Sequence, residues 1–200
     1  ILEAALELFF QNGYPNTRIK DIAHRAKTSV GNIYRYFANK EEVYYAIVTP
    51  EFVGSLQELL IKRTNILHKK HFNMPLTDEE SNWYEHVYFN YLIRNRKILN
   101  ILYLYSKDSK YEKIIEQALG YMLEEKIALL KEIKPLKIPE KFIDTLSLII
   151  IKTIDMNREV LSLNLEPEDM KRLLIDIDYF YHKGISALWN KMLDSGEFQE

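Results

Sequence analysis

The residues with the most distinctive chemistry gather in a basic segment near the start of the chain. Between Gly13 and Lys40, the one acidic residue is Asp21. The basic residues of this segment are Arg18, Lys20, Arg25, Lys27, Arg35 and Lys40. The whole chain has a formal net charge of -2 at pH 7, so the local charge is opposite in sign to that of the molecule. Because guanidinium and ammonium groups bind phosphate oxygens, the segment predicts a contact with double-stranded DNA.

The elements that must position these charges are two short helices between Thr17 and Phe37. Thr17 is a good N-cap, and apolar residues follow it at helical spacing. Lys27 and Thr28 interrupt the first helix, and Ser29 can cap a second one. Two short helices joined by a tight turn form a helix-turn-helix, whose second helix enters the major groove of DNA. The alternative is a basic helical pair in a protein that never contacts DNA.

The same stretch resembles the tetracycline-repressor-like (TetR) family of bacterial transcriptional regulators, over about the first quarter of the chain. In the turn, this chain has Lys27 and Thr28 where the family usually has glycine and an aliphatic residue. That turn position favours a positive φ, so we expect some strain at Lys27. The residues that carry the resemblance are Ile1, Leu2, Ala4, Ala5, Leu8, Phe9, Gly13, Tyr14, Thr17, Ile22, Ala23, Ala26, Ser29, Gly31, Ile33, Tyr34, Tyr36, Phe37, Lys40, Glu41 and Glu42.

The helix-turn-helix predicts two kinds of contact with operator DNA. Val30 and Asn32, near the start of the second helix, are placed to read base edges. Tyr34 and Tyr36 can donate their hydroxyls to phosphates, and Lys40 can reach a phosphate from the next helix. The predicted DNA-binding residues are Thr17, Arg18, Lys27, Thr28, Ser29, Val30, Asn32, Tyr34, Arg35, Tyr36 and Lys40.

Composition sets limits on the fold class. The chain has 200 residues, of which 47% are apolar, and it contains no cysteine. Helical periodicity dominates and no alternating strand pattern occurs, so we expect an all-α fold. Residues 1–46 should form a three-helix helix-turn-helix domain that binds DNA, and residues 47–200 a larger helical body for effector binding and dimerisation. The lack of cysteine fits a reducing compartment and favours a cytoplasmic protein. No apolar run is long enough to span a membrane.

Prolines and capping residues divide the body into helices. Pro50 falls inside a helical pattern, which leaves either one kinked helix or two helices at that point. Thr77 and Glu80 form a capping box that begins a helix rich in aromatic residues. Pro139 and Pro167 suit the first turns of the last two long helices.

Those last two helices carry more apolar surface than packing against one neighbour requires. The alternative is that both are central in the core of a monomer. The TetR resemblance implies instead that they form a four-helix bundle with their symmetry mates in a homodimer. An interior glycine such as Gly184 costs helix stability unless it permits close approach of another backbone. The predicted interface residues are Phe142, Ile149, Met156, Val160, Ile177, Phe180, Gly184 and Leu188.

The resemblance also implies a small-molecule effector that binds in the body. An excess of aromatic residues there favours an apolar cavity in which hydroxyl groups orient a ligand. The alternative for each tyrosine is close packing in the core. Coupling to DNA is expected through the helix that runs from Lys40 past Pro50. The predicted effector-binding residues are Tyr84, Tyr88, Tyr105, Tyr121 and Met156.

Signatures of catalysis or of metal binding are weak. No Gly-rich phosphate loop, nucleophile elbow or metal-binding helix motif occurs, so we expect no catalytic site, metal or cofactor. Asp155, Asp176 and Asp178 could act as paired acids, but a solvent-facing stripe is more frequent. His68 and His71 have no third ligand nearby. The sequence therefore predicts a dimeric repressor that a small molecule releases from its operator. The alternative is a helical ligand-binding or interaction protein without operator recognition.

Overall fold

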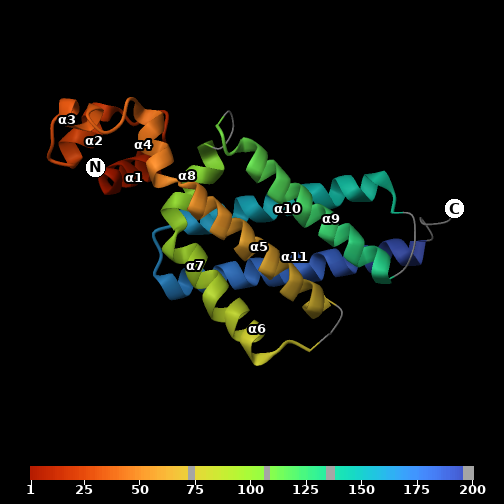
Figure 1. Cartoon of the computed structure of the whole chain (residues 1–200). Helices are drawn as coiled ribbons and strands as arrows, with labels where there is room; N and C mark the ends of the chain where they lie inside the picture. The colour runs from red at the N-terminus through yellow and green to blue at the C-terminus, as the bar shows by residue number, and fades with distance from the viewer. Residues whose placement is uncertain (72–74, 106–108, 134–137, 196–200) are drawn as a thin grey trace.

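The computed structural model describes residues 1–71, 75–105, 109–133 and 138–195, and every regular element in these ranges is a helix. This result confirms the all-α prediction. Figure 1 shows the first four helices as a head at one end of an elongated helical body. No helix within these ranges is both long enough and apolar enough to cross a membrane.

The head consists of four helices around a small apolar core. Ala5, Ile22, Ile33 and Val43 are completely buried at its centre, one from each helix. The side chain of Asn39 caps the fourth helix by accepting a hydrogen bond from the Glu42 N–H at 2.9 Å, as predicted. The helices are α1 (Leu2–Asn12), α2 (Ile19–Arg25), α3 (Val30–Tyr34) and α4 (Lys40–Ile47).

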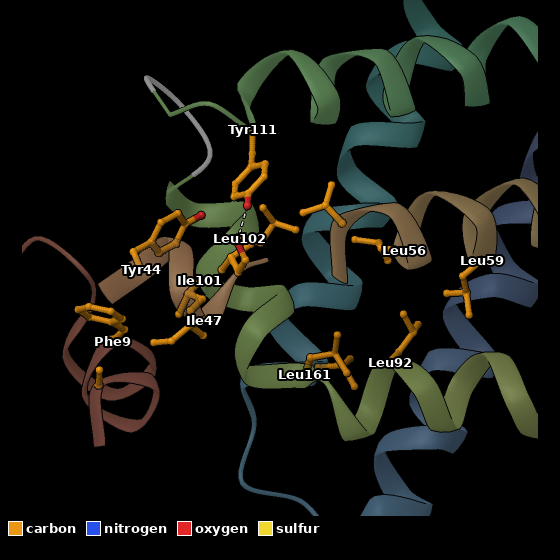
Figure 2. Close-up of a cluster of buried hydrophobic side chains, with 14 of the residues drawn as sticks. Phe9, Tyr44, Ile47, Leu56, Leu59, Leu92, Ile101, Leu102, Tyr111 and Leu161 are labelled. Carbon is orange, nitrogen blue, oxygen red and sulfur yellow. Dashed lines mark hydrogen bonds between the residues drawn. The ribbon is translucent and has the colours of Figure 1, made fainter. Parts of the chain in front are cut away.

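Two separate helices meet at Pro50, which decides between the two predicted alternatives. Helix α4 ends at Ile47 and α5 (Pro50–His71) begins with the proline. Between them, the Thr49 hydroxyl accepts a hydrogen bond from the N–H of Phe52 at 3.2 Å. The Tyr111 hydroxyl donates to the carbonyl of Val48 (Figure 2), so a residue far along the chain holds the junction.

The body continues with short helices that precede three long ones. The predicted capping box is confirmed, since the side chains of Thr77 and Glu80 each accept a hydrogen bond from the backbone N–H of the other residue. The wide π-helical turn that follows was not predicted, because periodicity does not distinguish it from an α-helix. The elements are α6 (Asp78–Asn82), η1 (Trp83–Tyr88), α7 (Phe89–Arg94), α8 (Arg96–Tyr105), α9 (Glu112–Ile133), α10 (Glu140–Ser162) and α11 (Pro167–Ser195).

Two groups of buried side chains hold the protomer together. The larger group runs without a break from the head into the body, and Figure 2 shows Phe9 and Ile47 of the head on one side and Leu92 and Leu161 of the body on the other. The smaller group joins α10 to α11, and it comprises Ile138, Phe142, Leu146, Ile150, Tyr181, Ile185 and Trp189. Head and body therefore share one continuous core.

Helix α8 connects the head to the body. It packs against α1 and against α10, and Lys97 forms an ion pair with Glu7 of the head. The ring of Tyr105 lies 5.7 Å from that of Tyr14, measured between centroids. Gly13 has φ +82°, and a Cβ there would lie 2.6 Å from the Tyr105 hydroxyl. The positive φ therefore favours glycine here, and any side chain would also displace the Tyr105 hydroxyl.

Candidate nucleic-acid interface and ligand cavity

Helix α3 presents one buried and one exposed face. Ile33 is completely buried against the head, whereas Val30 and Tyr34, one turn apart, are exposed. The Ser29 side chain caps the helix by accepting a hydrogen bond from the Asn32 N–H at 3.1 Å, as predicted. Arg35, which directly follows the helix, is exposed as well. The exposed face is free to enter a groove of DNA.

The turn before α3 is strained, as the substituted glycine position predicts. Lys27 has φ +51°, and it is the one non-glycine residue with positive φ among those described. Its side chain is exposed. The backbone closes the turn with a hydrogen bond from the Thr28 N–H to the Ala23 carbonyl at 3.0 Å. A lysine in this conformation keeps the turn and adds a positive charge beside the recognition helix.

Thr17 is wrongly assigned, both as an N-cap and as a phosphate ligand. Only 1% of its surface is exposed, and its hydroxyl lies 2.9 Å from the Gly13 carbonyl oxygen and 3.1 Å from that of Leu8. Helix α2 is capped one residue later, where the Arg18 N–H donates to the Asp21 carboxylate at 3.2 Å. Thr17 therefore fastens the loop to α1 and cannot reach a phosphate.

Lys40 is also a structural residue, which corrects its assignment to phosphate. Its ammonium donates to three backbone carbonyls, of Tyr14 at 2.6 Å, of Thr17 at 3.0 Å and of Pro15 at 3.3 Å. The nitrogen also lies 4.3 Å from the centroid of the Tyr14 ring. Burial lowers the pKa of this ammonium. Local sequence patterns did not reveal this role, because the contacts span more than twenty residues.

Replacing Lys40 by methionine should lower the free energy of unfolding by about 1 to 2 kcal/mol, because three carbonyls lose a charged donor. Binding to all duplexes should weaken alike while the salt dependence stays the same, since no phosphate contact is lost. Chemical denaturation and binding at several salt concentrations measure the two effects. The matched control is Lys20→Met in exposed α2, which should change stability by less than about 0.5 kcal/mol. A lower salt slope at unchanged stability would restore the phosphate assignment.

The side-chain amide of Asn32, which was predicted to read a base, makes a hydrogen bond within the turn. Its side-chain nitrogen donates to the Thr28 hydroxyl at 2.9 Å, and this bond is partly buried. To read adenine with both its oxygen and its nitrogen, the amide must give up this bond. The role of Asn32 in base reading stays a prediction, as does the role of the exposed Arg18, Arg35 and Tyr36 in binding phosphates.

A cavity of about 150 Å³ lies in the body among side chains of α5, η1, α7, α8, α9, α10 and α11. Its lining is mainly leucine and isoleucine, and polar groups reach it from Arg63, Asn100, Asn157, Arg158 and the tyrosines of three elements. An apolar enclosure with a few polar groups is typical of a small-molecule site.

One of the five predicted effector residues lines this cavity, namely Tyr88. Tyr84 instead donates its hydroxyl to buried Asp178, and Tyr105 contacts the head. Met156 is 42% exposed on the outside of α10. Tyr121 is half-buried in α9, where its neighbour Met122 lines the cavity. Aromatic content therefore did not identify which faces of these helices point into the cavity.

A buried ion pair adjoins the cavity, which corrects the view of Asp178 as part of a solvent-facing stripe. The Arg63 guanidinium of α5 donates to one carboxylate oxygen of Asp178 in α11, and Tyr84 donates to the other. Burial lowers the pKa of Arg63, but the charge and hydrogen bond of Asp178 together with the nearby Tyr88 and Tyr181 raise it further, so the net shift is upward. Asp176, two residues earlier, is exposed as predicted.

The outer face of α10 and α11 carries exposed apolar side chains. Among the predicted interface residues, Phe180 is 72% exposed, and Met156 and Gly184 are exposed as well. Ile149, Ile177 and Leu188 are half-buried. The assignment of Phe142 and Val160 to the interface is wrong because both are buried inside the protomer. A Cβ at Gly184 would meet no atom of the described residues within 4 Å, so no close contact among them explains this glycine.

Metal binding finds no support in the described ranges, where no three His, Asp or Glu side chains are placed to hold an ion. The side chains of His68 and His71 lie outside what the structure describes.

The head of the molecule matches a known protein family. Residues 1–47 match the profile described as bacterial regulatory proteins, tetR family. The fatty acid metabolism regulator protein of Bacillus subtilis (strain 168) is 29% identical over 87 residues, which are 39% of this chain and 45% of the relative. The transcriptional regulator HbdR of Aromatoleum sp. (strain CIB) is 44% identical over 45 residues, 22% of this chain and 20% of the relative. The chain thus spans less than half the length of these curated relatives.

Solved structures extend the likeness to the body. A TetR-like transcriptional regulator from Rhodococcus sp. RHA1 has a TM-score of 0.53 at 18% identity, and the match covers 90% of this chain and 91% of that one. The TetR family regulator PfmR from Thermus thermophilus has a TM-score of 0.51 at 17% identity, covering 90% and 92%. At these identities the likeness concerns the fold. The head thus matches the TetR family profile, and the fold along most of the chain is similar to that of solved TetR-like transcriptional regulators.

Proposed function

We propose that this protein is a homodimeric repressor that binds operator DNA with α3 and leaves it when a small molecule binds in the cavity of the body. The observation that carries the proposal is the position of α8. This helix lines the cavity with Leu99, Asn100 and Leu102, and it packs on α1 of the head. A ligand that moves α8 would move the head with it.

This route differs from the predicted one through a helix that continues past Pro50. Val48 and Thr49 separate the end of α4 from the start of α5, so one rigid helix does not connect the head to the body at this point. Two contacts support α8 as the route instead, the Lys97–Glu7 ion pair and the packing of Tyr105 on Tyr14. Both join α8 directly to the head.

The symmetry of the proposed dimer determines the symmetry of the operator. Two heads related by a two-fold axis require two inverted half-sites, with centres about 34 to 36 Å apart or a multiple of that distance. The exposed apolar face of α10 and α11 supports a symmetric interface. We therefore expect a roughly palindromic operator.

Selection from random duplexes, followed by binding measurements with variants, tests the proposal. Asn32→Ala should flatten the preference among duplexes, at about 1 to 3 kcal/mol for a good base contact. Arg35→Gln should weaken all duplexes alike and reduce the salt slope by about one. The control, Arg172→Gln, removes an exposed charge from α11 in the body and should change neither property. Failure to select any preferred duplex would refute the proposal.

Linkage tests the release step. The ligand must weaken DNA binding and DNA must weaken ligand binding by the same factor, about 5- to 150-fold for typical couplings. A ligand that occupies the cavity and leaves operator affinity unchanged would contradict release, even if the operator itself is real.

A further inference from the structure

Two arginines reach the cavity, and no acidic residue is among the described residues that line it. Arg63 comes from α5 and Arg158 from α10, while most of the remaining lining is aliphatic. Positive charge inside an apolar enclosure is costly unless it is paired. The two arginines therefore favour a ligand with negative charge, which the apolar side chains alone would not.

Both arginines keep a buried donor without an acceptor. The Nε atoms of Arg63 and Arg158 are buried and have no hydrogen-bond partner among the described residues. Asn157, next to Arg158, also lines the cavity, and its side-chain oxygen is a buried acceptor without a hydrogen-bond partner among the described residues. The Arg63 side chain is only 6% exposed, so water is largely excluded from it. Buried charged donors of this kind call for an acceptor.

The two acids that interact with these arginines already accept hydrogen bonds from other side chains, but only one of them forms an ion pair with its arginine. Asp178 pairs with Arg63 and also accepts from Tyr84. Asp155 interacts electrostatically with Arg158. Its carboxylate accepts hydrogen bonds from Tyr103 at 2.8 Å and from Lys152 at 3.3 Å. Burial and Asp155 raise the pKa of Tyr103 to about 12, so its hydroxyl stays protonated and donates to Asp155. Arg158 lies over the ring of Tyr103, with its guanidinium carbon 5.8 Å from the centroid. Arg158 thus makes no ion pair within the described residues and is the better placed of the two to bind an anion.

We propose that the cavity binds a small amphipathic carboxylate, whose chain lies among the aliphatic side chains and whose carboxylate accepts hydrogen bonds from Arg158 and Arg63. The carboxylate supplies the missing acceptors and the opposite charge together, which an alcohol or an amide does not. A cavity of about 150 Å³ made by mutation in another protein holds benzene, so a chain of about six carbons fits this one. The role of this molecule as effector rests on the proposed function, whereas its binding does not.

The test is calorimetric titration of the whole protein, without DNA, using hexanoate, hexan-1-ol and methyl hexanoate. These probes share the chain and differ in the anionic oxygen. Hexanoate should bind at least about tenfold more tightly than either neutral probe, because a charge-assisted hydrogen bond is lost in each of them. The series from butanoate to decanoate should show a maximum near six carbons. Equal affinities for hexanoate and hexan-1-ol would overturn the proposal.

Variants locate the carboxylate. Arg158→Gln should weaken hexanoate binding at least about tenfold and change hexan-1-ol binding little, whereas the control Arg172→Gln should change neither. Arg158→Lys keeps the charge and should recover part of the affinity. Circular dichroism checks that each variant is folded. Unchanged hexanoate affinity in a folded Arg158→Gln protein would refute this site.

The same titrations with a selected duplex separate the two proposals. If hexanoate binds with the expected dependence on Arg158 but leaves the duplex bound, the ligand site is correct and the release mechanism is wrong. If the duplex is bound specifically and a neutral molecule releases it while hexanoate does not bind, the repressor is correct and the carboxylate assignment is wrong.

Discussion

Replacing Asp178 by alanine is expected to lower the free energy of unfolding by about 3 to 5 kcal/mol. The change leaves the buried Arg63 guanidinium without its counter-charge, and it removes the acceptor of the Tyr84 hydroxyl. Both groups lie among apolar side chains of α5, η1 and α11, where water cannot replace the lost carboxylate. Urea denaturation at a fixed protein concentration measures the effect, since the stability of the proposed dimer would depend on concentration.

Two further variants show that the loss comes from the unpaired charge. Asp176→Ala removes the same side chain from an exposed position two residues away, and it should cost less than about 0.5 kcal/mol. The double variant Arg63→Met with Asp178→Leu removes both charges and should recover the part of the stability lost to the unpaired charge, because an apolar pair can replace a buried ion pair. The Tyr84 hydroxyl still lacks its acceptor in this variant, so the recovery should be incomplete. A single variant with the stability of the wild type would show that this pair is not buried in solution.

Phe180→Glu should dissociate the proposed dimer. The ring is 72% exposed in the protomer, one turn before Gly184, on the face where α10 and α11 lack a neighbour among the described residues. A two-fold axis brings two such rings into the interface, and burying each contributes about 1.5 to 3 kcal/mol. Losing both corresponds to an increase in the dissociation constant of about two to four orders of magnitude. Analytical ultracentrifugation over a range of concentrations measures this constant.

The neighbouring Tyr179 provides the control. It is 65% exposed, but it lies about 100° around the helix from Phe180 and therefore on another side of α11. Tyr179→Glu should leave the dimer intact. Operator affinity should fall with Phe180→Glu and not with Tyr179→Glu, because only the dimer binds two half-sites at once. Dimers that form equally in both variants would place the interface elsewhere.

Local features of the fold followed from the sequence because their causes are local. The side chains of Ser29, Asn39 and Thr77 accept hydrogen bonds from backbone groups three residues later, and each was recognisable from residue type and spacing. The positive φ of Lys27 followed from the place of the residue in the family pattern. Such features depend on a few neighbouring residues and little on the rest of the chain.

Contacts between distant segments did not follow in the same way. Arg63 and Asp178 are 115 residues apart, and no periodicity links them. Lys40 was expected on DNA because an exposed lysine near a basic helix suits phosphate, but its ammonium reaches the loop after α1. Met156 fits the apolar pattern of α10 as well as Ile150 does, yet only Ile150 faces the cavity. Which side of a helix points inward depends on how neighbouring helices pack, and one sequence does not contain that information in readable form.

The most direct test of the account is the competition between a selected duplex and a scrambled duplex of the same composition for the protein at one salt concentration. If α3 reads bases, the selected duplex should bind at least about a thousandfold more tightly, and its sequence should contain two inverted half-sites. Its affinity should also fall linearly on a logarithmic scale as salt increases. Equal binding of the two duplexes would contradict the account, because the exposed face of α3 would then serve no specific recognition.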